Sequence, residues 1–487
     1  MAQRIGVEVT SGIRSGPSNT GAPSGVLHVA GLTQHGPADQ AVTIRTVGEY
    51  ASVFGDRTPY SGPLFDTARM FFEEGGAELL VSRVTGPAAA TATVDIDGAG
   101  TDAPAVLRIS AAEPGAWSNN WTVTVAEADD GSTYSVEITD TAGETLALWR
   151  GITELSELVG RAASNQLVKV QTLTQDLEAR PLDGEYNLTG GSDDRENVTT
   201  AEVIAALERA GREGEGGAVA VPGYPADLIG AALTDYASRS RKIALLSPHQ
   251  DAELVEVEQL AGEISDTLDG SRAGLFYPHL VIPDAGATRI VSPEGFVAAV
   301  RARAFREGEF WRVPAGLENG RANWITGTTV PVNAELLDRL DASRVNGIQT
   351  SGARVWLNNW SSLADDPEHF GLLSSRDTLN NLKVLVKNRL ENYVWRTNDG
   401  RGFLFGEIES AVVSILHPIS QAGGFYAESN SENEEVDPGY TVVVDRSNNT
   451  IPQVARNEIT VDVAVRLSPV AKLIRVEIVK VAIGAAL

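Results

Sequence analysis

The sequence predicts a mixed α/β protein built from several domains, and three observations support this fold class. Helix-like and strand-like segments alternate over residues 26–85 and again over 192–370, the order expected for a largely parallel sheet. Between them, residues 86–191 are rich in Thr, Ala, Gly and Asp and are patterned as short β-segments, which indicates an inserted β-rich domain. Both ends of the chain carry isolated strands in which apolar residues alternate.

The α/β segments follow one another in a regular order. A glycine pair, Gly75-Gly76, ends the first predicted helix, and a threonine N-cap with Glu202 in the first turn supports the helix at 200–210. The expected core elements are strands 26–30 and 41–44, helix 63–73, strand 78–84, helix 200–210, strand 218–221, helix 226–239, strand 242–246, helix 253–268 and an extended segment at 274–282.

The remaining segments set the domain boundaries. Strands are predicted at 105–109, 121–126 and 134–139 with a short helix near 152–163, and the longest helical patterns are 376–393 and 406–422. The expected division is an N-terminal arm and linker (1–25), the first part of an α/β core (26–85), the inserted domain (86–191), a second α/β part (192–370), a C-terminal domain (371–467) and a C-terminal arm (468–487).

The terminal strands have no neighbour in sequence with which to pair. A strand exposes a row of N–H and C=O groups that need partners. From the pattern alone two outcomes stay open: the arms fold back onto their own domain, or they add a strand to the sheet edge of another chain. The alternating apolar residues are Ile5, Val7 and Val9 at the N-terminus, and Ile459, Val461, Val463, Val465, Leu467, Ile474, Val476 and Ile478 at the C-terminus.

Composition excludes several classes of protein. The 487 residues carry a net charge of −26, which argues against a general nucleic-acid binder, because phosphate binding needs a basic face. The absence of cysteine excludes disulfides, thiolate nucleophiles and cysteine-based metal sites, and fits folding in a reducing cytoplasm. We see no run that approaches the ~20 apolar residues of a membrane span, and no signal peptide.

Motifs for catalysis or cofactor binding are missing from the sequence. The segment Gly31–Gly36 begins like a phosphate loop, but Pro37 stands where the lysine is needed. The histidines never occur at metal-ligand spacing, and a Gly-x-Ser-x-Gly elbow is absent. We therefore expect no catalytic residue, metal or cofactor. The alternative is an α/β enzyme, such as a metal-free hydrolase, whose site is assembled from dispersed residues.

A series of short motifs is spread in order over nearly the whole chain. These segments are His35–Ala38, Val47–Tyr50, Phe54-Gly55, Leu64–Arg69, Phe71–Ala77, Ser82–Val84, Pro114–Asn120, Ala218–Gly223, Tyr277–His279, Ser292–Ala298, Trp311–Gly316, Val345–Ile348, Gly352–Arg354, the helix from Arg376 and the Asp445–Thr450 turn. Together they resemble the contractile tail sheath family of phages, tailocins and extracellular injection systems. Two positions depart from the family pattern, since Ser118 replaces a usual Gly and His279 a usual Trp.

The resemblance implies a structural subunit rather than an enzyme. Sheath proteins of this family form stacked six-fold rings around an inner tube and contract when a baseplate triggers them. The expected partners are therefore copies of the chain itself, the tube protein, and baseplate and tail terminator proteins, with no nucleic acid and no direct membrane insertion. The expected location is a virion tail or an injection particle assembled in the bacterial cytoplasm.

The resemblance also gives two sets of residues a role. In this family terminal arms exchange strands between subunits, so we expect donation by Ile5, Val7, Val9, Ile474, Val476 and Ile478. The expected acceptor strands, 440–444 and 458–467, contain Val442, Val444, Ile459, Val461, Val463 and Val465. In this family a helix of the innermost domain binds the tube largely through electrostatic contacts. The basic stripe Arg376, Lys383 and Lys387 is our candidate for that face, although an ordinary exposed helix face would carry the same pattern.

Overall fold

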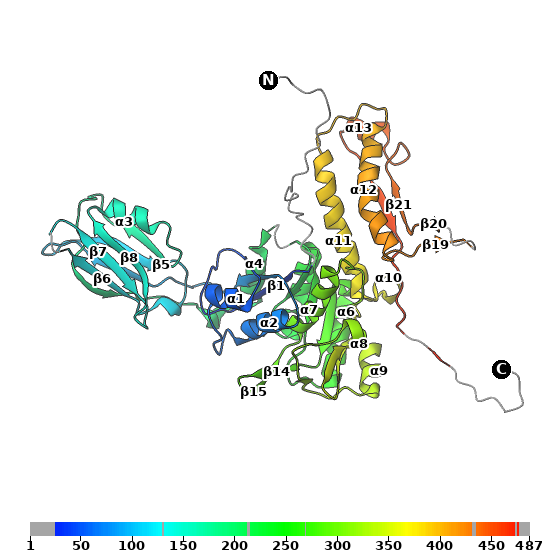
Figure 1. Ribbon diagram of the computed structural model, residues 1–487, viewed down its shortest axis with the longest axis horizontal. Helices are drawn as coiled ribbons and strands as arrows, with labels where there is room; N and C mark the ends of the chain where they lie inside the picture. The colour runs from blue at the N-terminus through cyan, green and yellow to red at the C-terminus, as the bar shows by residue number, and fades with distance from the viewer. Residues whose placement is uncertain are drawn as a thin grey trace, which may run out of the picture.

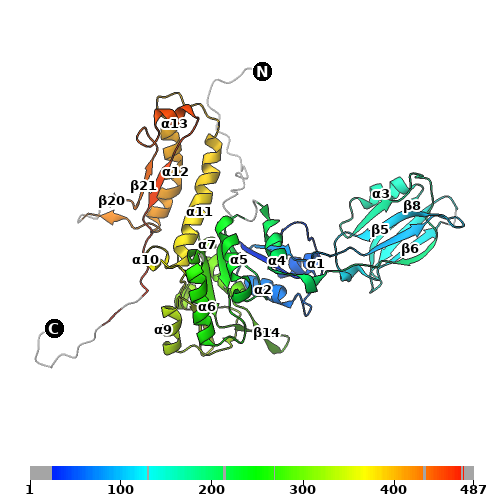
Figure 2. The ribbon, with the colours of Figure 1, turned by 180° about the vertical axis from the view of Figure 1, so that it is seen from behind.

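The computed structural model describes residues 25–128, 131–211, 215–267, 269–430, 435–472 and 475–476. Figures 1 and 2 show three parts: a central α/β core, a β-rich domain to one side, and a C-terminal domain of two long helices that stand on the core. This arrangement confirms the predicted mixed α/β class with an inserted β-rich domain. The described ends of the chain leave from the region where the core meets the helices.

The core is built on an eight-stranded sheet. Its order is β18-β17-β13-β12-β11-β1-β3-β2, and neighbours from β3 to β17 run parallel, while β2 and β18 are antiparallel edge strands. The inner strands are buried on both sides, which explains their continuous apolar sequence. The strands are β1 Leu27–Gly31, β2 Val42–Ile44, β3 Leu79–Arg83, β11 Ala218–Ala220, β12 Ile243–Leu246, β13 Ala273–Tyr277, β17 Asn346–Ser351 and β18 Arg354–Leu357.

Helices cover both faces of this sheet. One apolar cluster joins the sheet to α2 and α7, and a second joins it to α4, α5, α6 and α9. The predicted Thr cap of α4 is Thr199, whose side chain and Glu202 form a capping box. The helices are α1 Val47–Phe54, α2 Gly62–Glu73, α4 Thr200–Glu208, α5 Ala226–Arg239, α6 Leu254–Thr267, α7 Glu294–Arg306, α8 Gly316–Asn319, α9 Ala334–Ala342 and α10 Pro367–Phe370.

One core segment is extended as predicted but is divided between two sheets. The extended segment at 274–282 is two strands in two sheets, because the chain leaves the main sheet after β13. The next strand, β14 (Leu280–Asp284), pairs with β15 (Ala287–Val291) and β16 (Gly327–Thr328) in a small sheet beside the core. The apolar segment 274–282 therefore contains parts of two strands. Its sequence did not show where the first strand ends and the second begins.

The inserted segment folds around its own apolar cluster. A four-stranded sheet, β10-β6-β7-β8, faces a three-stranded sheet, β4-β5-β9, and α3 (Leu155–Ala162) packs against them. Asp193, just after this domain, forms a buried ion pair of 2.8 Å with Arg83 of β3 and accepts a hydrogen bond from the N–H of Ala116 at 3.3 Å, so it joins the domain to the core. The strands are β4 Thr93–Asp97, β5 Ala105–Ala111, β6 Thr122–Glu127, β7 Tyr134–Thr139, β8 Thr145–Ile152, β9 Val168–Thr172 and β10 Gly184–Asn187.

The C-terminal domain consists of α11 (Leu373–Leu390) and α12 (Phe403–Gln421), which pack side by side against a β-hairpin. By length and composition α12 could cross a membrane, but its apolar side chains from Leu404 to Ile419 include a set that packs against α11 and the hairpin. Helix α11 begins three residues earlier than predicted, because Leu373 is buried in the core cluster. The other elements are β19 Glu428–Ser429, β20 Glu435–Asp437, β21 Tyr440–Val443, α13 Ile451–Ala455 and β22 Asp462–Val465.

A buried ion pair also joins the core to the C-terminal domain. Arg301 of α7 donates two hydrogen bonds to Asp377 of α11, at 2.6 and 2.8 Å, and both side chains are almost fully buried. The guanidinium of Arg301 also lies over the ring of Phe305, 4.1 Å from its centre. Each of the two joints of the chain thus contains one buried Arg–Asp pair.

Candidate functional site: an open hairpin and a basic helix face

The hairpin of the C-terminal domain is a two-stranded sheet, and neither of its strands has a second partner strand within the described residues. The residues directly after β22 bond to segment 424–426: the N–H of Tyr426 donates to the Arg466 carbonyl at 2.8 Å, and Phe425 forms a β-bridge with Leu467. Strands β21 and β22 are antiparallel, with Val442 opposite Val463. A two-stranded sheet is marginally stable by itself, and here it is held by packing against α12. A further strand can bond to the outer N–H and C=O groups of such a two-stranded sheet.

The six predicted acceptor residues all lie in or beside this hairpin. Val442, Val463 and Val465 are in the strands, whereas the second strand is shorter than the expected 458–467 and leaves Ile459 and Val461 in the preceding segment. That segment packs on the helices, as does the buried Val444. Val463 is 38% exposed, so the alternation does not place every apolar side chain inward.

An asparagine pair ties the long connection between the two strands. Asn449 accepts a hydrogen bond from the N–H of Thr460 at 2.6 Å and donates one to the Thr460 carbonyl at 2.9 Å. Asn448 donates to the carbonyl of Val443 at 2.8 Å. These contacts fix the register of the hairpin ends, and they explain the Asp445–Thr450 motif noticed in the sequence.

The predicted donor strands lie almost entirely outside the described residues. This applies to Ile5, Val7, Val9, Ile474 and Ile478. Val476 is described, has no strand assignment and is 76% exposed. The donor role is therefore a prediction that the structure does not test.

The basic stripe of α11 is divided between buried and exposed positions. Arg376 is mostly buried: it donates to the hydroxyl of Ser271 at 2.6 Å, and its guanidinium lies 3.9 Å from the centre of the Phe370 ring. Lys387 pairs with Glu215 at 3.3 Å and is partly exposed. Lys383 is exposed and has no ion pair within the described part of the chain.

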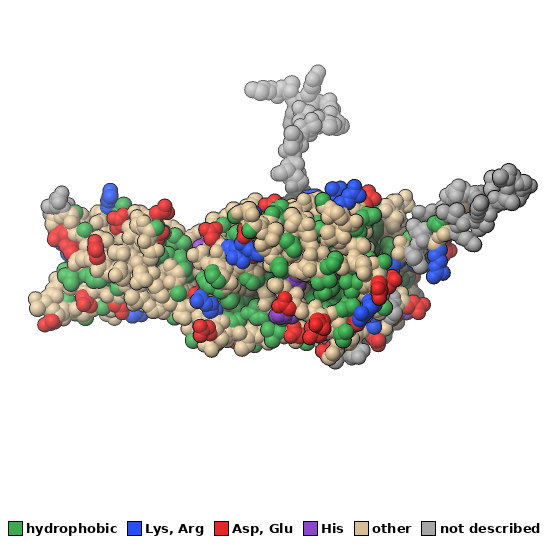
Figure 3. Space-filling view, turned by 90° about the horizontal axis from the view of Figure 1, so that it is seen from below, with side chains coloured by type: hydrophobic (Ala, Val, Ile, Leu, Met, Phe, Trp, Pro, Cys, Tyr) green, Lys and Arg blue, Asp and Glu red, His purple; other side chains and the backbone are tan. Residues whose placement is uncertain are grey.

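Two arginines from the core join this stripe, and the sequence analysis missed them. Partial burial lowers the pKa of Lys383, and so do the nearby charges of Arg272, Arg376 and Arg241. Arg241 follows α5 and Arg272 precedes β13, so no local pattern connects them to α11. Asp269 pairs with Arg272, and Glu215 pairs with Arg241 and Lys387. The basic groups around Lys383 still outnumber these two carboxylates, so the region is positive on a chain with a net charge of −26. In Figure 3, by contrast, acidic side chains are scattered along the length of the visible face.

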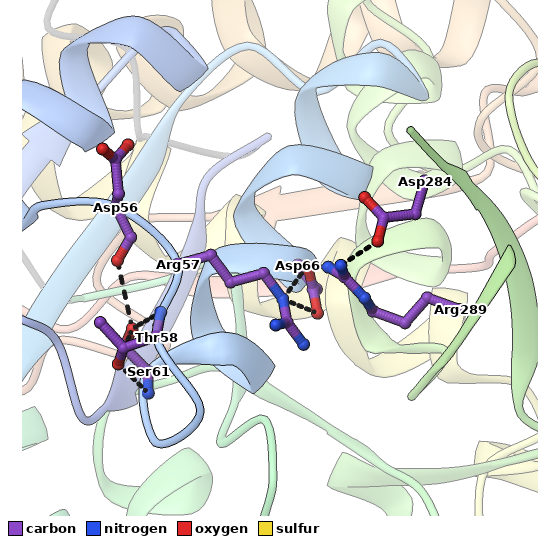
Figure 4. Close-up of polar contacts among 7 residues, drawn as sticks. All are labelled: Asp56, Arg57, Thr58, Ser61, Asp66, Asp284 and Arg289. Carbon is purple, nitrogen blue, oxygen red and sulfur yellow. Dashed lines mark hydrogen bonds and ion pairs between the residues drawn. The ribbon is translucent and has the colours of Figure 1, made fainter. Parts of the chain in front are cut away.

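The carboxyl edge of the main sheet is where an α/β enzyme would bind a ligand. A hollow of about 330 Å³ lies there, lined by residues that include Arg57, Asp66 and Ser247. Asp66 accepts hydrogen bonds from Arg57 at 3.0 Å and from Arg289 at 2.7 Å, and Arg289 also pairs with Asp284 (Figure 4). These charges neutralise one another and tie the β14–β15 hairpin to α2.

The remaining polar groups of this hollow do not form a nucleophilic set. Ser247 donates its hydroxyl hydrogen to the buried carboxyl of Glu294 at 2.5 Å. Burial raises the pKa of Glu294, so its carboxyl is held toward the neutral form. Burial and the nearby His249 lower the pKa of His279 to about 4. The alternative of a dispersed hydrolase site gains no support from this arrangement.

Comparison with solved structures identifies the fold. A sheath tail protein from Listeria innocua superposes with a TM-score of 0.61 over 87% of this chain and 89% of its own, at 14% identity. The fold is that of a contractile tail sheath protein. The sheath tail protein from Desulfitobacterium hafniense gives a TM-score of 0.55 over 90% of this chain and 94% of its own, at 13% identity.

A sheath from an injection particle matches over a longer stretch. The contracted helical sheath of the anti-feeding prophage covers 99% of this chain and 100% of its own, with a TM-score of 0.55 and 14% identity. No protein-family model matches the sequence, and no curated protein sequence matches it. The sheath fold therefore extends over all three parts of the molecule, while the sequence has diverged widely.

Proposed function

We propose that this chain is a structural subunit of a contractile sheath, which polymerises as stacked six-fold rings around an inner tube and contracts to drive that tube through a target envelope. The observation that carries the proposal is the sheath fold over nearly the full chain, including a hairpin whose two strands each have one partner strand within the described residues. The polar groups at the carboxyl edge of the sheet pair with one another, which favours a structural role over an enzymatic one.

The same proposal assigns partners and location. Copies of the chain bind one another, and the tube, baseplate and tail terminator proteins bind the polymer. The particle is a virion tail or an injection particle that is assembled in the bacterial cytoplasm. Helical sheath and baseplate structures of the anti-feeding prophage, which share the fold, support self-association and association with a baseplate.

Strand exchange provides the links between subunits in this proposal. The arm with Ile5, Val7 and Val9 and the arm with Ile474, Val476 and Ile478 add strands to the open edges of β21 and β22 in neighbouring copies. Backbone hydrogen bonds then hold the copies together while each subunit rotates. The supporting observation is that β21 and β22 each have one partner strand within the described residues.

Removing residues 1–12 is expected to abolish polymerisation without unfolding the subunit, because the described core and its apolar clusters begin after residue 25. Negative-stain electron microscopy should show striated hollow cylinders for the full chain and none for the truncated chain. Circular dichroism and the thermal midpoint should agree between the two. Normal cylinders from the truncated chain would reject strand donation by the N-terminal arm.

The basic face of α11 is proposed to contact the tube. Lys383 and Lys387 present their charges at the surface, and Arg376 adds to the positive potential from beneath. The face suits an acidic tube surface, since salt-sensitive attraction acts over about 8–10 Å at ordinary ionic strength.

Changing both Lys383 and Lys387 to Glu is expected to lower co-assembly with tubes about tenfold or more, because attraction becomes repulsion. A matched control is Arg108→Glu with Arg150→Glu, which reverses two exposed charges on β5 and β8 of the inserted domain. Co-sedimentation with purified tubes at several salt concentrations measures the effect. Co-assembly equal to that of the unmodified chain, with the same dependence on salt, would reject the assignment.

A further inference from the structure

The end of the C-terminal domain that points away from the core exposes an unusual number of apolar side chains. Trp395 is 99% exposed, Ile451 87%, Phe403 67% and Val394 62%. They come from the α11–α12 connection and from the starts of α12 and α13, which meet at this end of the domain (Figures 1 and 2). We call these four residues the apex cluster. Exposed apolar clusters of this kind mark interaction surfaces.

The loop that carries Trp395 is held in place rather than left free. Trp395 has φ +68°, a backbone conformation that costs energy for a bulky side chain. The adjacent Arg396 pairs with Glu407 at 2.7 Å and lies over the ring of Tyr393, and Arg446 donates to the Gly400 carbonyl at 3.1 Å. These contacts hold the backbone that presents Trp395 to solvent, and such pre-organisation lowers the entropy cost of binding.

A hollow lies on the same end of the domain. It measures about 670 Å³ and its lining includes Tyr393, Phe403, Gly406 and Ser410. A methyl group added at Gly406 would meet no atom within 4 Å, so the helix surface is open there. Aromatic walls, a small floor and a rim formed by the Arg396–Glu407 pair are the features of a pocket that receives an aromatic anchor.

The charges of this end favour another copy of the chain as the occupant. Its ionic side chains pair locally, as Arg396–Glu407, Arg401–Asp399 and Arg456–Glu458. The whole chain, in contrast, carries −26, so two copies repel each other over most of their surfaces. Because the charges at this end cancel and its surface is apolar, electrostatic repulsion between two copies is weakest there.

We propose that the apex cluster is a contact between copies of this chain, in which Trp395 of one copy enters the hollow beside Gly406 of the next. The protrusion and the hollow are both present on each copy, so the contact can repeat from subunit to subunit. The proposal rests on the proposed sheath function and adds to strand exchange a contact between side chains. Phe403, Val394 and Ile451 surround the inserted ring and exclude water.

Two substitutions test the contact from opposite sides. Trp395→Ala removes the anchor, and we expect the concentration needed for polymerisation to rise about tenfold or more. Gly406→Phe fills the hollow and should have the same effect. Gly406→Ala is the matched control: it improves the helix and leaves the hollow open, so polymerisation should be unchanged. Sedimentation across a concentration series measures all four proteins, with thermal melts to confirm folding.

The lack of cysteine allows a direct test by crosslinking. Trp395→Cys protein mixed with Ser410→Cys protein under oxidising conditions should form a disulfide between the two variants. Trp395→Cys mixed with Val255→Cys, which is exposed on the distant α6, should not. Preferential linking of the first pair supports the contact, and equal linking of both pairs overturns it.

The outcomes separate this inference from the proposed function. If unmodified protein polymerises and Trp395→Ala protein polymerises equally well, the apex contact is wrong and the sheath function stands. If Trp395→Ala polymers form normally but no longer hold a tube, the cluster belongs to the tube interface, and the contact between copies is overturned. Unmodified protein that stays monomeric at every concentration overturns both.

Discussion

Replacing Asp377 with Ala is expected to lower the free energy of unfolding by about 3–5 kcal/mol, because it leaves the charge of Arg301 buried without a partner. The pair is bidentate, at 2.6 and 2.8 Å, and nearly sealed from water. Burial raises the pKa of Asp377 while the Arg301 charge acts to lower it. Among the described residues Asp377 is the ion-pair partner of Arg301, so loss of its carboxylate leaves the guanidinium uncompensated.

Chemical denaturation, followed by circular dichroism, measures this loss. Asp235→Ala is the matched control, since it removes an exposed ion pair with Arg239 and should cost no more than about 0.5 kcal/mol. The double change Arg301→Met with Asp377→Leu should recover most of the stability, because neither charge then remains buried. A loss below about 1 kcal/mol in Asp377→Ala, or no recovery in the double variant, would contradict the role given to this joint.

Replacing Lys242 with Met is expected to stabilise the protein and to remove part of its dependence on pH. Lys242 is fully buried at the start of β12, where its ammonium donates to the Gly216 carbonyl at 2.5 Å. Burial, with the nearby charge of Arg301, lowers the pKa of Lys242 from 10.5 to about 7. The unfolded chain therefore binds this proton more tightly than the folded chain does.

The sign of the pH dependence follows from this difference in proton binding. Below pH 7 both states hold the proton, and the full cost of a buried charge is present. Between pH 7 and 10.5 the unfolded state binds more protons, so stability rises by up to about 1.4 kcal/mol per pH unit. Above 10.5 the contribution of this group is constant.

Denaturation of the native chain and of Lys242→Met at pH 7, 8 and 9 checks the prediction. The difference in stability between the two proteins should shrink as pH rises, by about 2–3 kcal/mol over the two units. Comparison of two proteins cancels the titration of other groups, including the tyrosines. A difference that stays constant with pH would show that Lys242 keeps an ordinary pKa in the folded state.

Local sequence patterns predicted the elements because each element depends on neighbours along the chain. The buried strands of the core were visible as apolar runs, and α4 was visible from its cap at Thr199 and Glu202. The C-terminal strands were visible as period-2 alternation, although β22 is shorter than expected. The predicted strand began at residue 458, whereas β22 begins at Asp462. Ile459 and Val461 are partly buried because they pack against α12, and not because they pair in the hairpin.

The candidate sites were predicted in part. The spacing on α11 placed Arg376 and Lys383 on one face, but it did not show that the core covers Arg376 and leaves Lys383 exposed. Arg241 and Arg272 reach this face from other elements, so only the folded chain connects them to Lys383. The apex cluster was likewise hidden, because an apolar residue in sequence looks the same whether it is buried or exposed.

The sequence by itself determined the α/β alternation, the inserted β-rich domain and the acidic charge, since these depend on residue order and composition. Only the tertiary structure decided which charges meet. The pairs Arg83–Asp193 and Arg301–Asp377 join residues that are distant in the chain, and burial makes each pair strong and specific. It also decided which apolar residues remain in water, because exposure depends on how the domains pack and not on any local pattern.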